Sequence, residues 1–146
     1  MSRPLKFAQT VIVSCPPDRV FAFRCAITNS PNWRRGVVSA SQSTLGPIDV
    51  GSRWTEVRSG PGGVTQEWEL EITEYDPSRV LGISGHHEQT QLEERHEFAD
   101  EGGSTRYTVV LEVTGSSLPG AAIQKQLVET LLNLKWAMEA PFLRTP

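Results

Sequence analysis

A strict alternation of acidic and large apolar residues marks the middle of the sequence, Glu67-Trp68-Glu69-Leu70-Glu71-Ile72. Successive side chains of a β-strand point to opposite faces of a sheet, so this repeat predicts a strand with one buried and one wet face. The same kind of alternation recurs over residues 105–114. We therefore expect the centre of the chain to form an antiparallel sheet with one buried face.

Turn-forming residues divide the neighbouring sequence into further strands. Glycine, proline, aspartate and serine gather at residues 45–47, 60–63, 76–78 and 100–104. Such clusters are typical of short connections between antiparallel neighbours. A stretch rich in β-branched residues near the N-terminus adds one more strand. The predicted strands are residues 7–13, 37–44, 52–59, 64–75, 80–86, 89–99 and 105–114.

Three helices are expected, two short and one long. Residues 17–27 carry apolar side chains at helical spacing, and a second short helix is expected to run through Arg35. A long helix is predicted from Leu118 to about Ala140, and a helix of about 20 residues spans about 30 Å, enough to cross a small domain. Its apolar stripe is Ile123, Leu127, Leu131, Leu134 and Met138.

Composition excludes several classes of protein. The 146 residues fit a single domain, 1–146, and their 38 % hydrophobic and 21 % charged content is ordinary for a soluble globular chain. A net charge of −3 argues against nucleic-acid binding, which needs a basic face. No apolar stretch is long enough for a membrane span. Because Cys15 and Cys25 show no metal or disulfide spacing, we expect a cytoplasmic protein.

This order of elements predicts an α+β protein in which a curved antiparallel sheet of about seven strands wraps around the C-terminal helix, with two short helices after the first strand. Six short sequences fit one known pattern: Cys15-Pro16-Pro17-Asp18-Arg19-Val20-Phe21, Ser30-Pro31-Asn32-Trp33, Val50-Gly51-Ser52-Arg53, Glu74-Tyr75-Asp76-Pro77, Gly102-Gly103-Ser104-Thr105-Arg106 and Leu132-Asn133-Leu134-Lys135. With them the chain resembles the polyketide cyclase/dehydrase branch of the START and birch-pollen-allergen-like superfamily, whose members have the helix-grip fold.

The resemblance implies a cavity between the sheet and the long helix that holds a hydrophobic small molecule. Some members of the superfamily cyclise or dehydrate polyketides, whereas others only carry their ligand. They share no catalytic motif, so the resemblance assigns no catalytic residue. The chain also departs from the family, because residues 25–28 lack the aspartate often found before the Pro-x-Trp corner.

Candidate acid/base residues come from the strand predicted at residues 89–99. Leu92 and Phe98 are the apolar residues of this strand, so we expect their face to point inward. Glu94 and His96 lie on the same face, because alternate residues of a strand point to the same side. Burial would raise the pKa of the Glu94 carboxyl, which would hold the imidazole ready for proton transfer. The alternative is that a β-bulge reverses the register, or that both groups are satisfied structurally at a wet cavity mouth.

The remaining predicted site residues form the walls of the cavity. Of the adjacent His86 and His87, only His87 has the inward parity, and the histidine spacing matches no metal-binding pattern. We therefore expect no metal and no cofactor. The predicted ligand-binding residues are Trp68, Leu70, Thr90, Leu92, Phe98, Tyr107, Val109, Leu111, Leu127, Leu131 and Leu134.

Three functions stay open at this point. The first is a carrier or sensor of a lipid- or polyketide-like molecule, which needs only the cavity. The second is a polyketide cyclase or dehydratase that uses Glu94 or His96 as acid/base. The third is a protein-interaction module acting through the acidic sheet face of Glu67, Glu69 and Glu71, where a homodimer is one possible assembly.

Overall fold

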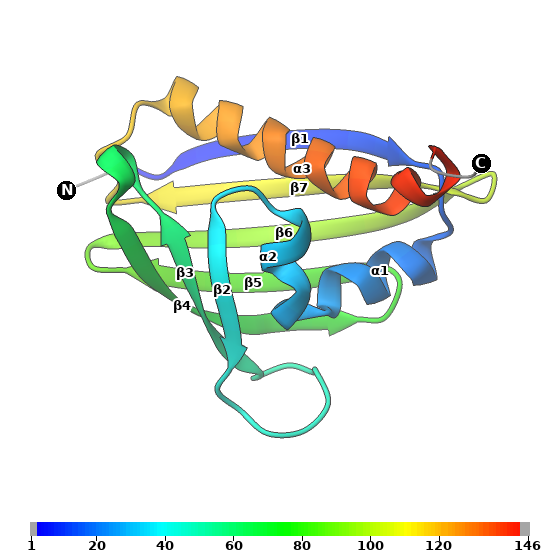
Figure 1. Cartoon of the computed structure of the whole chain (residues 1–146), viewed down its shortest axis with the longest axis horizontal. Helices are drawn as coiled ribbons and strands as arrows, with labels where there is room; N and C mark the ends of the chain where they lie inside the picture. Colours follow the sequence, from blue (N-terminus) through cyan, green and yellow to red (C-terminus); the bar gives the residue numbers. More distant parts are fainter. Residues whose placement is uncertain (1–2, 144–146) are drawn as a thin grey trace.

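The computed structural model describes residues 3–143, and within them the elements follow the predicted order (Figure 1). One seven-stranded antiparallel sheet has the order β1-β7-β6-β5-β4-β3-β2. Its strands are β1 (Leu5–Val13), β2 (Val37–Gln42), β3 (Arg53–Ser59), β4 (Thr65–Asp76), β5 (Val80–His87), β6 (Thr90–Glu101) and β7 (Ser104–Thr114). The helices are α1 (Pro17–Cys25), α2 (Ser30–Trp33) and α3 (Gly120–Leu143), with single 3-10 turns η1 (Ile27–Asn29) and η2 (Pro61–Gly63).

The three helices lie on one side of the sheet. Figure 1 shows α3 running along β1 and β7, while α1 and α2 lie beside it. Phe21 of α1 packs edge-on against Phe98 of β6, with the ring centroids 5.2 Å apart. The expected α+β arrangement, a curved sheet of seven strands around a long C-terminal helix, is therefore confirmed.

The alternation in β4 and the stripe on α3 determine the buried core. Trp68, Leu70 and Ile72 are buried, and the intervening acidic residues face outward as predicted. The predicted apolar stripe of α3 is buried along its whole length, and its members are 5 %, 7 %, 1 %, 0 % and 7 % exposed (Ile123, Leu127, Leu131, Leu134 and Met138). These side chains join the sheet residues in one hydrophobic cluster.

The register of β6 matters most for the site. Leu92, His96 and Phe98 are buried, so this strand keeps a regular alternation from Thr90 to Phe98. His96 lies opposite Val109 of β7, and Glu94 lies opposite Leu111. No register shift occurs between β6 and its neighbours within the described residues. The β-bulge that would have turned Glu94 and His96 outward is therefore absent from this strand.

Several element ends differ from the prediction. The helix expected over 17–27 ends at Cys25, because Ala26 leaves helical geometry at φ −76° and ψ 72° and a 3-10 turn follows. α2 ends at Trp33 rather than Arg35, and β2 ends at Gln42. α3 continues to Leu143, past the predicted end near Ala140. None of the helices in the described part of the chain is long and apolar enough to cross a membrane.

Candidate functional site

A cavity of about 440 Å³ lies between the sheet and α3. This volume is within the range of about 300–1,000 Å³ found for small-molecule sites. Both layers contribute apolar side chains to its wall, which are Trp68, Leu92, Val109, Leu111, Val113, Leu118, Ile123, Leu127 and Leu131. The cavity can therefore hold an apolar molecule between the sheet and the helix.

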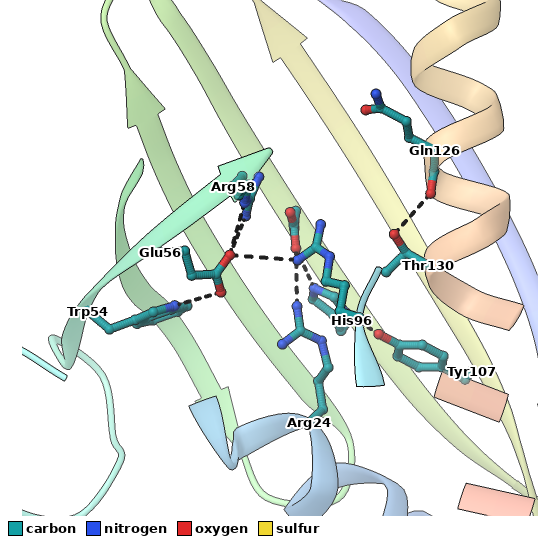
Figure 2. A network of polar contacts seen from close by, with 10 residues as sticks. Arg24, Trp54, Glu56, Arg58, His96, Tyr107, Gln126 and Thr130 are labelled. Atoms are coloured by element: carbon teal, nitrogen blue, oxygen red, sulfur yellow. Dashed lines mark hydrogen bonds and ion pairs between the residues drawn. The ribbon is translucent and has the colours of Figure 1, made fainter. Parts of the chain in front are cut away.

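A chain of hydrogen bonds joins three polar side chains at the buried end of the cavity. Glu94 Oε1 lies 2.8 Å from His96 Nε2, and His96 Nδ1 lies 2.6 Å from the hydroxyl of Tyr107. Glu94 and His96 occupy adjacent inward positions of β6, and Tyr107 lies on the neighbouring strand β7. Figure 2 shows His96 beside Tyr107. The side chains of Glu94 and His96 are only 8 % and 3 % exposed.

The environment of this chain fixes its protonation state. Burial, and after it the positive charge of Arg24, lowers the pKa of His96 below its usual value, so the imidazole is neutral at pH 7. Burial raises the pKa of Tyr107 to about 12, so its hydroxyl keeps its proton. Tyr107 then donates to Nδ1, and the Nε2–H group donates to Glu94.

The expectation that burial leaves Glu94 with a raised pKa is wrong. Burial acts in that direction, but the hydrogen bond from His96 and the charges of Arg34 and Arg24 outweigh it and bring the pKa below its usual value. Arg24 lies closest, with Nη2 at 3.7 Å from Glu94 Oε1. Glu94 is therefore a carboxylate at neutral pH and a weak base.

Three arginines gather around this end of the cavity from different elements. Arg24 comes from α1, Arg34 follows α2, and Arg58 comes from β3. Arg24 is only 4 % exposed, which is unusual for a charged residue. It also lies over the ring of Trp33, 5.7 Å from the centroid. The helix α1 thus turns a guanidinium group rather than an apolar side chain toward the cavity.

Glu56 of β3 is the second carboxylate of the cluster. Its Oε1 accepts a hydrogen bond of 2.9 Å from Arg58 Nε, and its Oε2 accepts one of 3.0 Å from Trp54 Nε1 (Figure 2). Arg34 Nη1 lies 4.0 Å from the same Oε1 atom of Glu56. Burial alone would raise the pKa of Glu56, but the positive charges of Arg58 and Arg34 have the larger and opposite effect. The pKa of Glu56 is therefore lowered, and the carboxylate is charged at neutral pH.

Most of the predicted site residues line the cavity. They are Trp68, Thr90, Leu92, Glu94, His96, Val109, Leu111, Leu127 and Leu131, and His87 lies there with them. The other four are buried in the core instead of on the cavity wall, namely Leu70, Phe98, Tyr107 and Leu134. Tyr107 is connected to the cavity wall through its hydrogen bond with His96. That these residues contact a ligand stays a prediction.

Sequence reasoning missed the arginine cluster and Glu56. Two signals were available for them. Arg24 stands one helical turn after Val20, on the buried side of α1. Glu56 and Arg58 share the parity of Trp54, which is buried in β3. Charged residues at buried parity would have pointed to a polar site, since charges are buried only when paired.

A curved sheet around a long C-terminal helix, with a cavity between them, defines a helix-grip protein. The model of one family, described as polyketide cyclase / dehydrase and lipid transport, matches residues 4–139. Because this match spans most of the sequence, the chain belongs to that family. A comparison with curated protein sequences gives no significant match.

Solved structures show the same fold at low sequence identity. A START superfamily protein from Mycobacterium smegmatis is 17 % identical with a TM-score of 0.74, over 93 % of this chain and 95 % of that one. The protein Ara h 8.0201 is 13 % identical with a TM-score of 0.75, over 98 % of this chain and 100 % of its own.

A third similar structure is the di-domain ARO/CYC StfQ from the steffimycin biosynthetic pathway. It is 18 % identical with a TM-score of 0.77, and the match covers 94 % of this chain but 46 % of StfQ. At such low identity these three structures establish the fold of the chain and no more.

Proposed function

We propose that this protein binds a hydrophobic small molecule, lipid- or polyketide-like, in the cavity between the sheet and α3, and acts as a carrier or sensor. The observation that carries the proposal is the cavity itself, whose apolar wall comes from both the sheet and the helix. Membership of a family described by polyketide chemistry and lipid transport supports the same class of ligand.

The state of the polar groups favours binding over proton transfer. Both ring nitrogens of His96 take part in hydrogen bonds, so the neutral imidazole has no free lone pair for a substrate proton. Glu94 has a lowered pKa, and an efficient general base has a pKa near the working pH. Without rearrangement, these residues orient a ligand better than they deprotonate one.

The binding proposal is tested by filling the cavity. We expect the neutral fluorophore N-phenyl-1-naphthylamine to bind saturably to the protein. Leu127→Trp should weaken this binding about tenfold or more, because the larger ring occupies the cavity beside the sheet. Glu129→Trp is the matched control, since it adds the same ring to the exposed side of α3 and should leave the affinity unchanged.

Thermal unfolding of both variants shows whether they retain the fold. Equal affinities of folded Leu127→Trp and Glu129→Trp would place the fluorophore outside the cavity. The absence of saturable binding to the wild-type protein would contradict the proposal directly.

A second candidate function is that of a polyketide cyclase or dehydratase, favoured by the chain Glu94–His96–Tyr107 at the cavity. In that case an enolisable polyketide-like substrate is turned over, and Glu94→Gln and His96→Gln each lower the rate about a hundredfold or more, as expected for a general acid or base. Both variants should still bind the neutral fluorophore. Turnover that persists in both would rule out these residues as acid/base.

A further inference from the structure

The charges at the buried end of the cavity do not balance. Three guanidinium groups, those of Arg24, Arg34 and Arg58, face two carboxylates, Glu56 and Glu94, and the neighbouring imidazole is neutral. Among the described residues, these arginines and Glu94 are the only arginine, lysine, aspartate or glutamate side chains that line the cavity. One positive charge therefore stays uncompensated in a site largely shielded from water, where charge is expensive.

The pKa of Arg34 is consistent with this excess of positive charge. Burial, followed by repulsion from Arg58, lowers the pKa of Arg34 to about 10. This value still leaves Arg34 charged at pH 7. All three guanidinium groups consequently contribute to the positive potential of the cavity.

Two guanidinium nitrogens in the cluster also lack a hydrogen-bond acceptor within the described residues, Arg24 Nε and Arg58 Nη2. Arg58 Nη2 does lie 2.9 Å from Glu56 Oε1, but this ion pair lacks the alignment of a hydrogen bond. Both residues line the cavity, and Figure 2 shows them reaching the cluster from α1 and from β3. A buried donor without an acceptor is costly, and more so when it is charged.

We propose that the ligand carries an anionic oxygen group, of which a carboxylate is the simplest form, and that this group binds among Arg24, Arg34 and Arg58 while its apolar body lies against Leu127 and Leu131. This inference rests on the proposed binding function and deepens it by naming the class of ligand. A planar guanidinium fork matches two carboxylate oxygens, so one anion would both supply the missing acceptors and balance the charge.

The test uses three probes of equal length, dodecanoate, dodecan-1-ol and dodecylamine, each displacing N-phenyl-1-naphthylamine at 0.15 M salt. We expect the acid to bind about tenfold or more tightly than the alcohol, and the amine to bind most weakly. Equal affinities of acid and alcohol would overturn the inference while leaving the binding function intact. Failure of all three probes and of the fluorophore would contradict the binding function itself.

The variant Arg58→Gln tests whether the preference for dodecanoate over dodecan-1-ol comes from the three arginines. It removes one guanidinium group and should lower the affinity for dodecanoate about tenfold more than that for dodecan-1-ol. Arg53→Gln is the matched control, because Arg53 is on the same strand but exposed and paired with Glu71. An equal loss of acid and alcohol binding in Arg58→Gln would contradict the assignment. The wild-type comparison needs no variant, so it decides the question even if Arg58→Gln fails to fold.

Discussion

His96 is a buried histidine whose neighbours favour its neutral form. Tyr107 donates to one ring nitrogen, the other donates to Glu94, and Arg24 opposes a positive charge on the ring. The same contacts fix the orientation of the ring. Such a residue links folding to pH, because its proton affinity differs between the folded and the unfolded chain.

We predict that His96 makes the protein less stable as the pH falls from about 6.5 to about 4. In the unfolded chain His96 has its ordinary pKa of 6.5, whereas in the folded chain burial lowers it to about 4. The unfolded state therefore binds more protons in this window, and acid favours unfolding. Between pH 7.5 and 5.5 this linkage contributes about 1 kcal/mol.

Urea denaturation at the two pH values measures this contribution. His96→Gln should lose less stability than the wild type between pH 7.5 and 5.5, by about 1 kcal/mol. Glu94 does not disturb the comparison, since its lowered pKa affects stability only below its ordinary value of 4.5. Equal losses in both proteins would show that His96 titrates alike in the folded and unfolded states.

At the scale of elements, the buried face is predicted correctly where the sequence carries a regular hydrophobic repeat. β4, β7 and α3 each carry a regular apolar repeat, and their buried faces were predicted correctly from it. β6 has fewer apolar residues, yet Leu92 and Phe98 were enough to place Glu94 on the same inward face. In each of these elements local sequence determines which face is buried.

The buried charged residues of β3 and α1 are not marked by an apolar repeat. The buried positions of β3 after Trp54 are charged, so its alternation of polarity disappears from the sequence. Arg24 and Glu56 are each paired with a residue from another element, Glu94 and Arg34, and Glu56 is also hydrogen-bonded within β3. The partners from other elements are distant in sequence, and no local repeat records them. The predicted half of the site is therefore the apolar wall with Glu94 and His96, and the missed half is the arginine cluster.

At the scale of the whole molecule, the two faces of the sheet have different chemistry. The inner face forms the cavity, whereas the outer face carries Glu67, Glu69 and Glu71. This acidic face is partly neutralised by the protein itself, since Arg53 Nε lies 3.1 Å from Glu71. The inner face has the opposite sign, with one excess positive charge at the cavity.

We predict that the outer face can be changed without altering the cavity. The triple variant Glu67→Lys, Glu69→Lys and Glu71→Lys should bind N-phenyl-1-naphthylamine and dodecanoate within about twofold of the wild type at 0.15 M salt. The reason is that exposed charges are screened over a Debye length of about 8 Å, and the sheet separates them from the ligand. Fluorescence titration measures both affinities, and sedimentation velocity follows any change in self-association.

The two measurements separate binding in the cavity from interaction through the outer face. If the triple variant binds both probes normally but loses an association that the wild type shows, the acidic face is an interface independent of the cavity. If it instead loses the neutral fluorophore while remaining folded, the two faces are coupled through the strands they share, and the outer face is part of the binding function. Unchanged binding and unchanged self-association would leave the acidic residues with a solubilising role, as is usual for charged sheet surfaces.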